Sequence, residues 1–243
     1  MSVTSPSANP AELFIKSWQI YQDIIHHNYM FHREISAEVF KSLGNFKCGQ
    51  SINVLDLGCG DASMTLPLLP VERIRSYVAC DLSQPALDIA RSQLEALKIP
   101  HELICDNMVL VAGVQPKNSC DVVLSSYAIH HLEAKQKVQL IEAIASALAP
   151  GGILVLIDVF REPGESHADY MSHYTGFLKM CWVKLSQEAQ RLVVEHITTT
   201  DFPELPEFYE NLCQAKGLTA GKRLGKHTWH EAWLFSKLPS RHP

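Results

Sequence analysis

Five short apolar segments between residues 52 and 159 constrain the fold more than any other feature of the chain. They are Ile52–Leu57, Arg75–Asp81, His101–Cys105, Asp121–Ser125 and Ile153–Val159. Most are apolar at successive positions, which is typical of strands covered by helices on both faces. Helical patterns over 86–98 and 134–148 separate some of them, the first preceded by Ser83 as an N-cap. The sequence therefore predicts an α/β protein with a parallel sheet.

The regions on either side of these segments predict further helices and two more strands. Residues 11–43 have a helical pattern that "HHNYM" interrupts, so we expect two N-terminal helices, and a third helix over 63–69. Residues 164–216 are expected to be wholly helical. The segments 218–224 and 228–236 lie too close for a helical crossover, so they should pair antiparallel.

The 243 residues are enough for one such domain. We expect a disordered lead-in over residues 1–10 and a single domain over 11–243. Within it the predicted parts are the N-terminal helices 11–46, a cofactor-binding core 51–160, a helical substrate cap 161–216 and a strand pair 217–238.

Polar residues and glycines follow the predicted strands, at the edge of the sheet where α/β proteins bind ligands. Gly58 and Gly60 follow the first strand, and without Cβ atoms they permit a tight turn close to a ligand. Asp81 comes 21 residues after Gly60 (81 − 60), about the spacing at which an acid meets ribose hydroxyls. Asp106 ends the next strand, where a carboxylate can accept from an adenine amino group. The pattern predicts a nucleoside-containing ligand.

The dinucleotide fingerprint of nicotinamide dehydrogenases does not match here. Its third glycine position is Ser63. Asp56 and Asp61 would also repel a pyrophosphate, whereas they suit a ligand with a cationic group. A dehydrogenase is therefore excluded.

Five motifs in order resemble those of class I S-adenosylmethionine-dependent methyltransferases of the small-molecule type. They are "VLDLGCGD", "ACDLS", "CDNM", "DVVLSSYAIHHL" and "LAPGGILVLID". The resemblance runs from about Ser51 to Val159. It implies a Rossmann-like, doubly wound seven-stranded sheet, mostly parallel with an antiparallel C-terminal strand pair. It also implies a helical insertion between strands five and six, and S-adenosylmethionine as the cofactor.

The resemblance places the methionine and ribose parts of the cofactor at the first two strands. Gly58 and Gly60 should lie under the methionine part, and Asp56 should orient this loop or meet the amino group. Asp81 should hold the ribose hydroxyls, with Leu82 beside it.

The same resemblance places the adenine and the sulfonium of the cofactor at the ends of the next two strands. Asp106 should take the adenine amine, with Asn107 and Met108 beside the ring. Ser125 and Ser126 should line the cofactor near the sulfonium.

An N-terminal helix often closes over the cofactor in related enzymes. A tyrosine or basic side chain there meets the cofactor carboxylate, and Tyr29 or Arg33 is the candidate here. The alternative for both is a solvated helix face.

The expected class of acceptor follows from what the sequence lacks. Ser125-Ser126-Tyr127-Ala128 has no proline of the kind found in nucleobase amine methyltransferases, and Asp158 lacks the Asp-Asn pair of catechol-type enzymes. A net charge of −5 argues against nucleic acid. We therefore expect methyl transfer by in-line displacement to a nitrogen or oxygen of a small polar metabolite. The alternatives are a protein or tRNA methyltransferase, or a catalytically inactive cofactor-binding partner subunit.

A general base is needed only if the acceptor arrives protonated. The candidates are His130, after strand four, and His173 and Tyr174 in the helical insertion. His173 and Tyr174 share a helix face with Tyr170 and Phe177. That face is either a wall over the substrate or an aromatic stripe docked on the core.

We expect no bound metal, no membrane partner and a cytoplasmic location. The seven cysteines form no C-x-x-C pair, and the adjacent pairs His26-His27 and His130-His131 should point apart on helices. The chain has no run of 18 apolar residues, and "MSVTSPSANP" is not a signal peptide. The sequence leaves the identity of the acceptor and the oligomeric state open.

Overall fold

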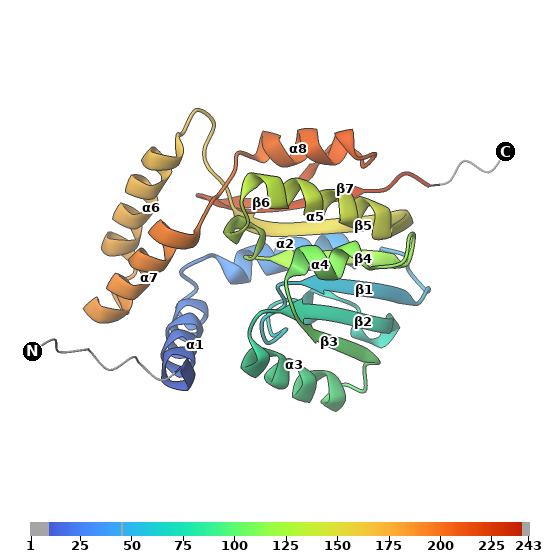
Figure 1. Ribbon diagram of the computed structural model, residues 1–243, viewed down its shortest axis with the longest axis horizontal. Coiled ribbons are helices and arrows are strands. Elements are labelled where there is room, and N and C mark those ends of the chain that lie inside the picture. Colours follow the sequence, from blue (N-terminus) through green and yellow to red (C-terminus); the bar gives the residue numbers. More distant parts are fainter. Residues whose placement is uncertain (1–9, 45, 240–243) are drawn as a thin grey trace, which may run out of the picture.

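A seven-stranded sheet lies at the centre of the molecule, with helices on both of its faces (Figure 1). This computed structural model describes residues 10–44 and 46–239, so residues 1–9 of the expected lead-in lie outside the described residues. The strand order is β3-β2-β1-β4-β5-β7-β6. The strands are β1 (Ile52–Leu57), β2 (Ile74–Asp81), β3 (His101–Cys105), β4 (Cys120–Ser126), β5 (Leu148–Val159), β6 (Lys222–His227) and β7 (His230–Ser236).

The pairing of the strands confirms the predicted fold class. Strands β1 to β5 pair in parallel, whereas β7 lies between β5 and β6 and pairs antiparallel with both. The strand order reverses between β1 and β4, which is the point at which open α/β sheets hold their ligands. Leu218, where we expected the sixth strand to begin, makes only a single bridge to Lys237.

Eight α-helices are present among the described residues. They are α1 (Pro10–His26), α2 (His32–Leu43), α3 (Gln84–Ala96), α4 (Met108–Gly113), α5 (Ala134–Ala147), α6 (His167–Cys181), α7 (Gln187–Thr200) and α8 (Pro206–Ala215). The break between α1 and α2 occurs where predicted, with Asn28 and Phe31 at positive φ. The helix expected over 63–69 is absent, and only a 3-10 turn forms at Leu66–Leu68. Pro67 and Pro70 explain this, since proline has no N–H to continue a helix.

The helices form two layers on the sheet. Side chains of α2 and α3 pack on one face, among them Val39 and Leu94. Side chains of α5 and α8 pack on the other, among them Ile141 and Tyr209. Helix α8 therefore lies in the layer beside α5, although the sequence grouped it with the substrate cap (Figure 1).

Helices α1, α6 and α7 form a separate group beyond one end of the sheet (Figure 1). We call this group the cap. Its own apolar cluster includes Tyr174, Leu178 and Trp182, and it joins the sheet at Val159 at the carboxyl end of β5. Trp182 is 1% exposed, stacks on Tyr29 at 5.1 Å between ring centroids, and meets Tyr174 edge-on. The cap therefore covers the carboxyl ends of β4 and β5.

Replacement of Trp182 tests whether this cluster holds the cap in place. Trp182→Ala should lower the free energy of unfolding by about 3–5 kcal/mol, because the removed ring leaves a cavity between α1 and α6. Val183→Ala is the matched control; Val183 is 68% exposed, so its loss should change stability by less than about 0.5 kcal/mol. Urea unfolding of the two variants measures both values, and equal losses would contradict the proposed packing.

Candidate cofactor and acceptor site

Backbone hydrogen bonds fix the glycine loop after β1 to the end of β2. The amides of Gly58 and Cys59 donate to the carbonyl of Cys80 at 2.9 and 3.0 Å, and the amide of Gly60 donates to Asp81 Oδ2 at 2.9 Å. Gly58 has φ +73°, and a Cβ built on it would lie 2.4 Å from the Cβ of Ala128. Only glycine fits this position.

Asp81 lies at the edge of the loop, where the sequence placed it. Its Oδ2 accepts from Gly60, and its Oδ1 accepts from the amide of Ser83 at 2.8 Å. Ser83 in turn caps α3 by accepting from Ala86. Each oxygen of the Asp81 carboxylate can accept a second hydrogen bond. This fixed carboxylate therefore suits a pair of sugar hydroxyls.

Asp56 is fully buried behind the loop rather than exposed on it. Tyr77 donates its hydroxyl to Asp56 Oδ2, and the Tyr77 hydroxyl also lies 3.3 Å from that of Thr65. Burial raises the pKa of Asp56 to about 6, against the lowering effect of these hydroxyls. Among the described residues its Oδ1 has no hydrogen-bond partner. A buried acceptor of this kind beside Asp81 fits a ligand with a cationic amino group.

The residues at the end of β3 lie around the beginning of α4. Asp106 is exposed and accepts from the amide of Asn107, which caps α4 by accepting from Val109. The Met108 methyl would lie 3.4 Å from a Cβ on Gly58, so Met108 lies beside the glycine loop.

Three further predicted residues differ in their surroundings. Leu82 is 75% exposed next to Asp81, and Ser126 is partly buried at the end of β4. Ser125 is 1% exposed and donates its hydroxyl to the carbonyl of Leu57 at 3.0 Å, so it ties β4 to β1.

Tyr21 is the side chain of α1 that approaches the glycine loop. Burial, together with the negative charges of Asp61 and Asp81, raises the pKa of Tyr21. The two residues expected in this role make other contacts. Tyr29 accepts from the amide of Lys184 at 2.7 Å, and Arg33 donates to the carbonyl of His26 at 2.9 Å. The sequence missed Tyr21 because it belongs to the apolar face of α1.

A cavity of about 310 Å³ lies between the cap and the carboxyl ends of β4 and β5. Most of its lining is apolar, with contributions from Ile24, Trp182 and Ile197, and Tyr21 also lines it. Polar side chains gather elsewhere in the lining: Tyr127, His130, His131, Tyr174, His196 and Asp201. Tyr127 and His130 flank Ala128, which lies against Gly58, so the cavity adjoins the glycine loop.

Two of the three base candidates line this cavity. Tyr174 is 2% exposed, and its hydroxyl lies 3.3 Å from His230 Nε2. His173 is on the outer side of α6, where its side chain is 61% exposed and pairs with Glu165 at 2.8 Å. The inward face of α6 is formed by Tyr170, Tyr174 and Leu178. The helix face proposed from sequence is therefore not one surface. Tyr174 lines the cavity, whereas His173 faces solvent.

His130, the third candidate, is held by a buried carboxylate. Its Nδ1 hydrogen-bonds Asp158 Oδ1, and its backbone amide donates to Asp158 Oδ2 at 3.1 Å. Burial opposes the charged imidazolium, but the charge and hydrogen bond of Asp158 outweigh it and raise the pKa of His130. The ring is thereby fixed with its Nε2 directed away from Asp158.

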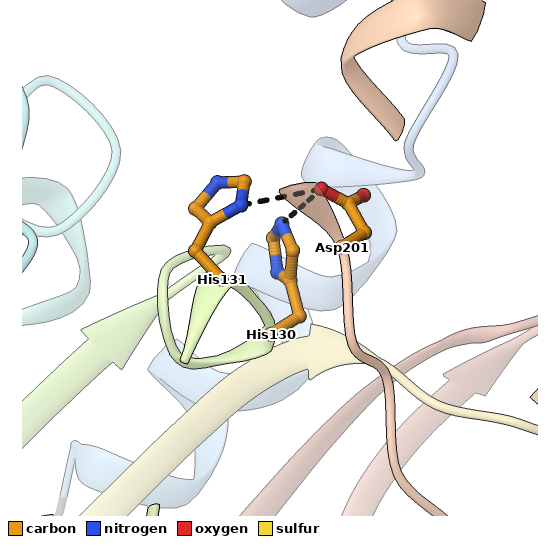
Figure 2. A group of neighbouring side chains, drawn as sticks. All are labelled: His130, His131 and Asp201. Atoms are coloured by element: carbon orange, nitrogen blue, oxygen red, sulfur yellow. Dashed lines mark ion pairs between the residues drawn. The ribbon is translucent and has the colours of Figure 1, made fainter. Parts of the chain in front are cut away.

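The expectation that His130 and His131 point apart is wrong. Their ring centroids are 4.0 Å apart, because Ile129–His131 is a 3-10 turn and not part of an α-helix. Asp201, the C-cap of α7, lies against both rings (Figure 2). Its Oδ1 is 3.7 Å from His130 Nε2 and 3.2 Å from His131 Nδ1.

Comparison with known proteins agrees with this geometry. A family profile described as a methyltransferase domain matches residues 54–152. The chain therefore contains a methyltransferase domain that is similar to those of class I S-adenosylmethionine-dependent methyltransferases. This confirms S-adenosylmethionine as the cofactor, and the glycine loop with Asp56 and Asp81 fits its amino group and ribose.

Relatives with assigned names include a carboxy-S-adenosyl-L-methionine synthase of Pseudoalteromonas atlantica. It is 26% identical over 151 residues, which are 60% of each chain. Matches to two further synthases of that name cover 69% and 59% of their lengths.

Two solved structures from Burkholderia thailandensis share the fold. A 1,6-didemethyltoxoflavin-N1-methyltransferase is 17% identical with a TM-score of 0.55, covering 97% of this chain and 93% of that one. An O-methyltransferase family protein is 14% identical with a TM-score of 0.62, covering 90% of this chain and 58% of that one.

Among the described residues, no helix is long and apolar enough to cross a membrane.

Gly58 and Gly151 form a matched pair for testing the loop. Both have a φ near +75°, but a Cβ on Gly151 would have nothing within 4 Å. Gly151→Ala should therefore cost only the positive-φ strain of about 1–2 kcal/mol. Gly58→Ala should cost about 1–3 kcal/mol more, from its contact with Ala128, and should weaken S-adenosylmethionine binding. Unfolding curves and calorimetric titration measure these effects, and equal costs would contradict the described contact.

The burial of Asp56 predicts a specific pH dependence of stability. The pKa of this carboxyl is about 6 in the folded protein and 3.8 in a model peptide. Because the folded protein holds this proton more tightly than the unfolded chain, the protonated carboxyl stabilises the fold at pH values below 3.8. That stabilisation is lost as the pH rises through about 6. The free energy of unfolding of the wild type, relative to Asp56→Asn, should therefore fall by about 2–3 kcal/mol between about pH 4 and pH 8. A difference that does not change with pH would contradict this environment for Asp56.

Proposed function

We propose that this protein transfers the methyl group of S-adenosylmethionine to a nitrogen or oxygen atom of a small molecule bound in the cap cavity. The observation that carries the proposal is the position of the cavity. It is lined by Tyr127 and His130, which flank Ala128, and Ala128 lies against Gly58 of the glycine loop. An acceptor in it therefore lies next to the edge at which the family binds its cofactor.

The residues of the chain contribute mainly by holding the two reactants in line. The cofactor supplies a methyl group on a sulfonium, which is already a good leaving group. Orientation of two bound reactants can account for about 7–11 kcal/mol of a reaction barrier. The glycine loop, Asp81 and Tyr21 fix one reactant, while the cap encloses the other and excludes water. His130 and Tyr174 are the polar groups that meet a protonated acceptor.

The lining of the cavity narrows the class of acceptor. Its apolar side chains from α1 and α7, such as Ile24 and Ile197, suit an aromatic or aliphatic body. Its histidines and Tyr174 suit a single polar head. We therefore propose an acceptor with an apolar body and one nucleophilic group, in place of the uniformly polar metabolite expected from sequence. A protein or tRNA substrate is disfavoured by a cavity of this size.

The names of the curated relatives supply a second candidate, the synthesis of carboxy-S-adenosylmethionine. Such a site has to hold a carboxylate, for which arginine or lysine is the usual partner. Among the described residues, neither an arginine nor a lysine lines the cavity, and Asp201 adds a negative charge. Methyl transfer is therefore the better supported reaction.

Mass spectrometry distinguishes the two reactions directly. The protein should be incubated with S-adenosylmethionine and a pool of phenols and heteroaromatic amines as methyl acceptors, and in parallel with a pool of carboxylic acids as carboxyl donors. The expected result is S-adenosylhomocysteine together with one methylated acceptor. A carboxylated cofactor as the product would instead contradict methyl transfer and support the synthase reaction.

Asp81 provides the test of the cofactor edge. Asp81→Ala removes the charged acceptor for the ribose and leaves the amide of Gly60 without its partner. It should raise the dissociation constant of S-adenosylmethionine by about 10–100-fold, as lost hydrogen bonds to a charged group typically do. Asp88→Ala is the control and should bind normally, since Asp88 is an exposed acid on α3 whose carboxylate accepts from Gln84. Equal binding by the two variants would contradict the assignment.

A further inference from the structure

We propose that His130, His131 and Asp201 bind a divalent transition metal ion of the zinc type, at the polar end of the cap cavity. One atom from each residue, namely His130 Nε2, His131 Nδ1 and an Asp201 carboxylate oxygen, is available to the ion, and these atoms all lie within 4.8 Å of one another (Figure 2). The inference concerns binding alone, so it does not depend on methyl transfer.

The two distances from Asp201 Oδ1 are close to those expected around one shared ion. Zinc–nitrogen and zinc–oxygen bonds of about 2.0–2.2 Å at tetrahedral angles place neighbouring ligand atoms about 3.3–3.5 Å apart. Asp201 Oδ1 lies 3.2 Å from His131 Nδ1 and 3.7 Å from His130 Nε2. The second distance is too long for a hydrogen bond. Asp201 Oδ1 already accepts from the Thr200 hydroxyl at 3.2 Å, so a cation here would chiefly satisfy the lone pair of His130 Nε2.

The surroundings of His130 match those of a metal-bound histidine. Histidine ligands commonly donate their other ring N–H to a carboxylate, which fixes the ring and raises the basicity of the ligating nitrogen. Asp158 holds His130 Nδ1 in this manner and is 1% exposed at the end of β5. Nε2 is thereby left as a lone pair facing Asp201. The side chains of His130 and Asp201 are only 7% and 5% exposed, so both are already fixed by packing.

The ligand types select among metals. Two imidazoles with one carboxylate suit zinc, cobalt, nickel or ferrous ions, whereas magnesium and calcium prefer oxygen ligands only. Three protein ligands also leave at least one coordination position open, as in catalytic rather than structural zinc sites. Because all three residues line the cavity, this position is accessible to a ligand in the cavity. An oxygen or nitrogen of a bound molecule is the group that would fill it.

The experiment is a zinc titration of the full-length protein after treatment with a chelator, in competition with an indicator dye. The wild type should bind one zinc ion per chain at micromolar concentration or below. His131→Gln should weaken binding by more than about tenfold, since it removes one ligand from the most exposed position of the site. Asp201→Asn should weaken binding similarly. Circular dichroism of the metal-free variants verifies that both remain folded.

The matched control is His27→Gln, which alters the other adjacent histidine pair of the chain. His26 ends α1 and His27 follows it; both are exposed, with ring centroids 4.9 Å apart. This variant should bind zinc as the wild type does. Cobalt should give visible absorption bands of a four- or five-coordinate ion without the near-ultraviolet band of a thiolate ligand, which separates this site from the free cysteines.

Three results would overturn the proposal. They are equal zinc affinity in the wild type and His131→Gln, saturation only at millimolar zinc, and a thiolate band in the cobalt spectrum. In each case the cluster would be an ion pair of histidines with Asp201 that binds no metal. Since no acceptor is present in this test, these results leave the proposed methyl transfer unaffected.

Discussion

The attachment of the glycine loop to the end of β2 is the interaction on which the rest of the site depends. The carbonyl of Cys80 receives two amides of the loop, and the carboxylate of Asp81 receives a third. These bonds fix the positive φ of Gly58 and bring the loop against Ala128, which follows β4. The sheet reverses its strand order at this place, so one small loop joins both halves of the sheet to the ligand edge.

A second set of interactions joins the sheet to the cap, and it involves buried carboxyl groups. Asp158 and Asp201 are both almost completely buried, and burial of charge is unfavourable unless a partner compensates it. His130 is the partner of Asp158, and His131 lies 3.2 Å from Asp201. Because Asp158 belongs to β5, His130 follows β4 and Asp201 ends α7, the cluster fixes the cap relative to the strand ends. The apolar cluster around Trp182 packs the cap on the sheet, so His130 and Asp201 can line the cavity.

The sequence predicted the cofactor side better than the acceptor side, and the reason is physical. The glycine turn, Asp81 and the cap of α3 arise from short-range constraints on φ, hydrogen bonding and strand ends, which local sequence expresses directly. The contact of Asp201 with the histidines joins residues some 70 positions apart in the chain (201 − 130 = 71), and no local pattern encodes it. The same applies to Tyr21, whose place in an apolar helix face gave no indication of its approach to the acidic loop.

Tyr21 also shows how the two sides of the site are coupled. One side chain of α1 lines the acceptor cavity and lies near Asp61 and Asp81. Helix α1 is held to the rest of the cap by Ile24 and by the stacking of Tyr29 on Trp182. A ligand at the glycine loop that contacts Tyr21 therefore acts on the same helix that forms one wall of the cavity. Binding on one side then stabilises the helix that the other side needs, which makes the two affinities interdependent by linkage.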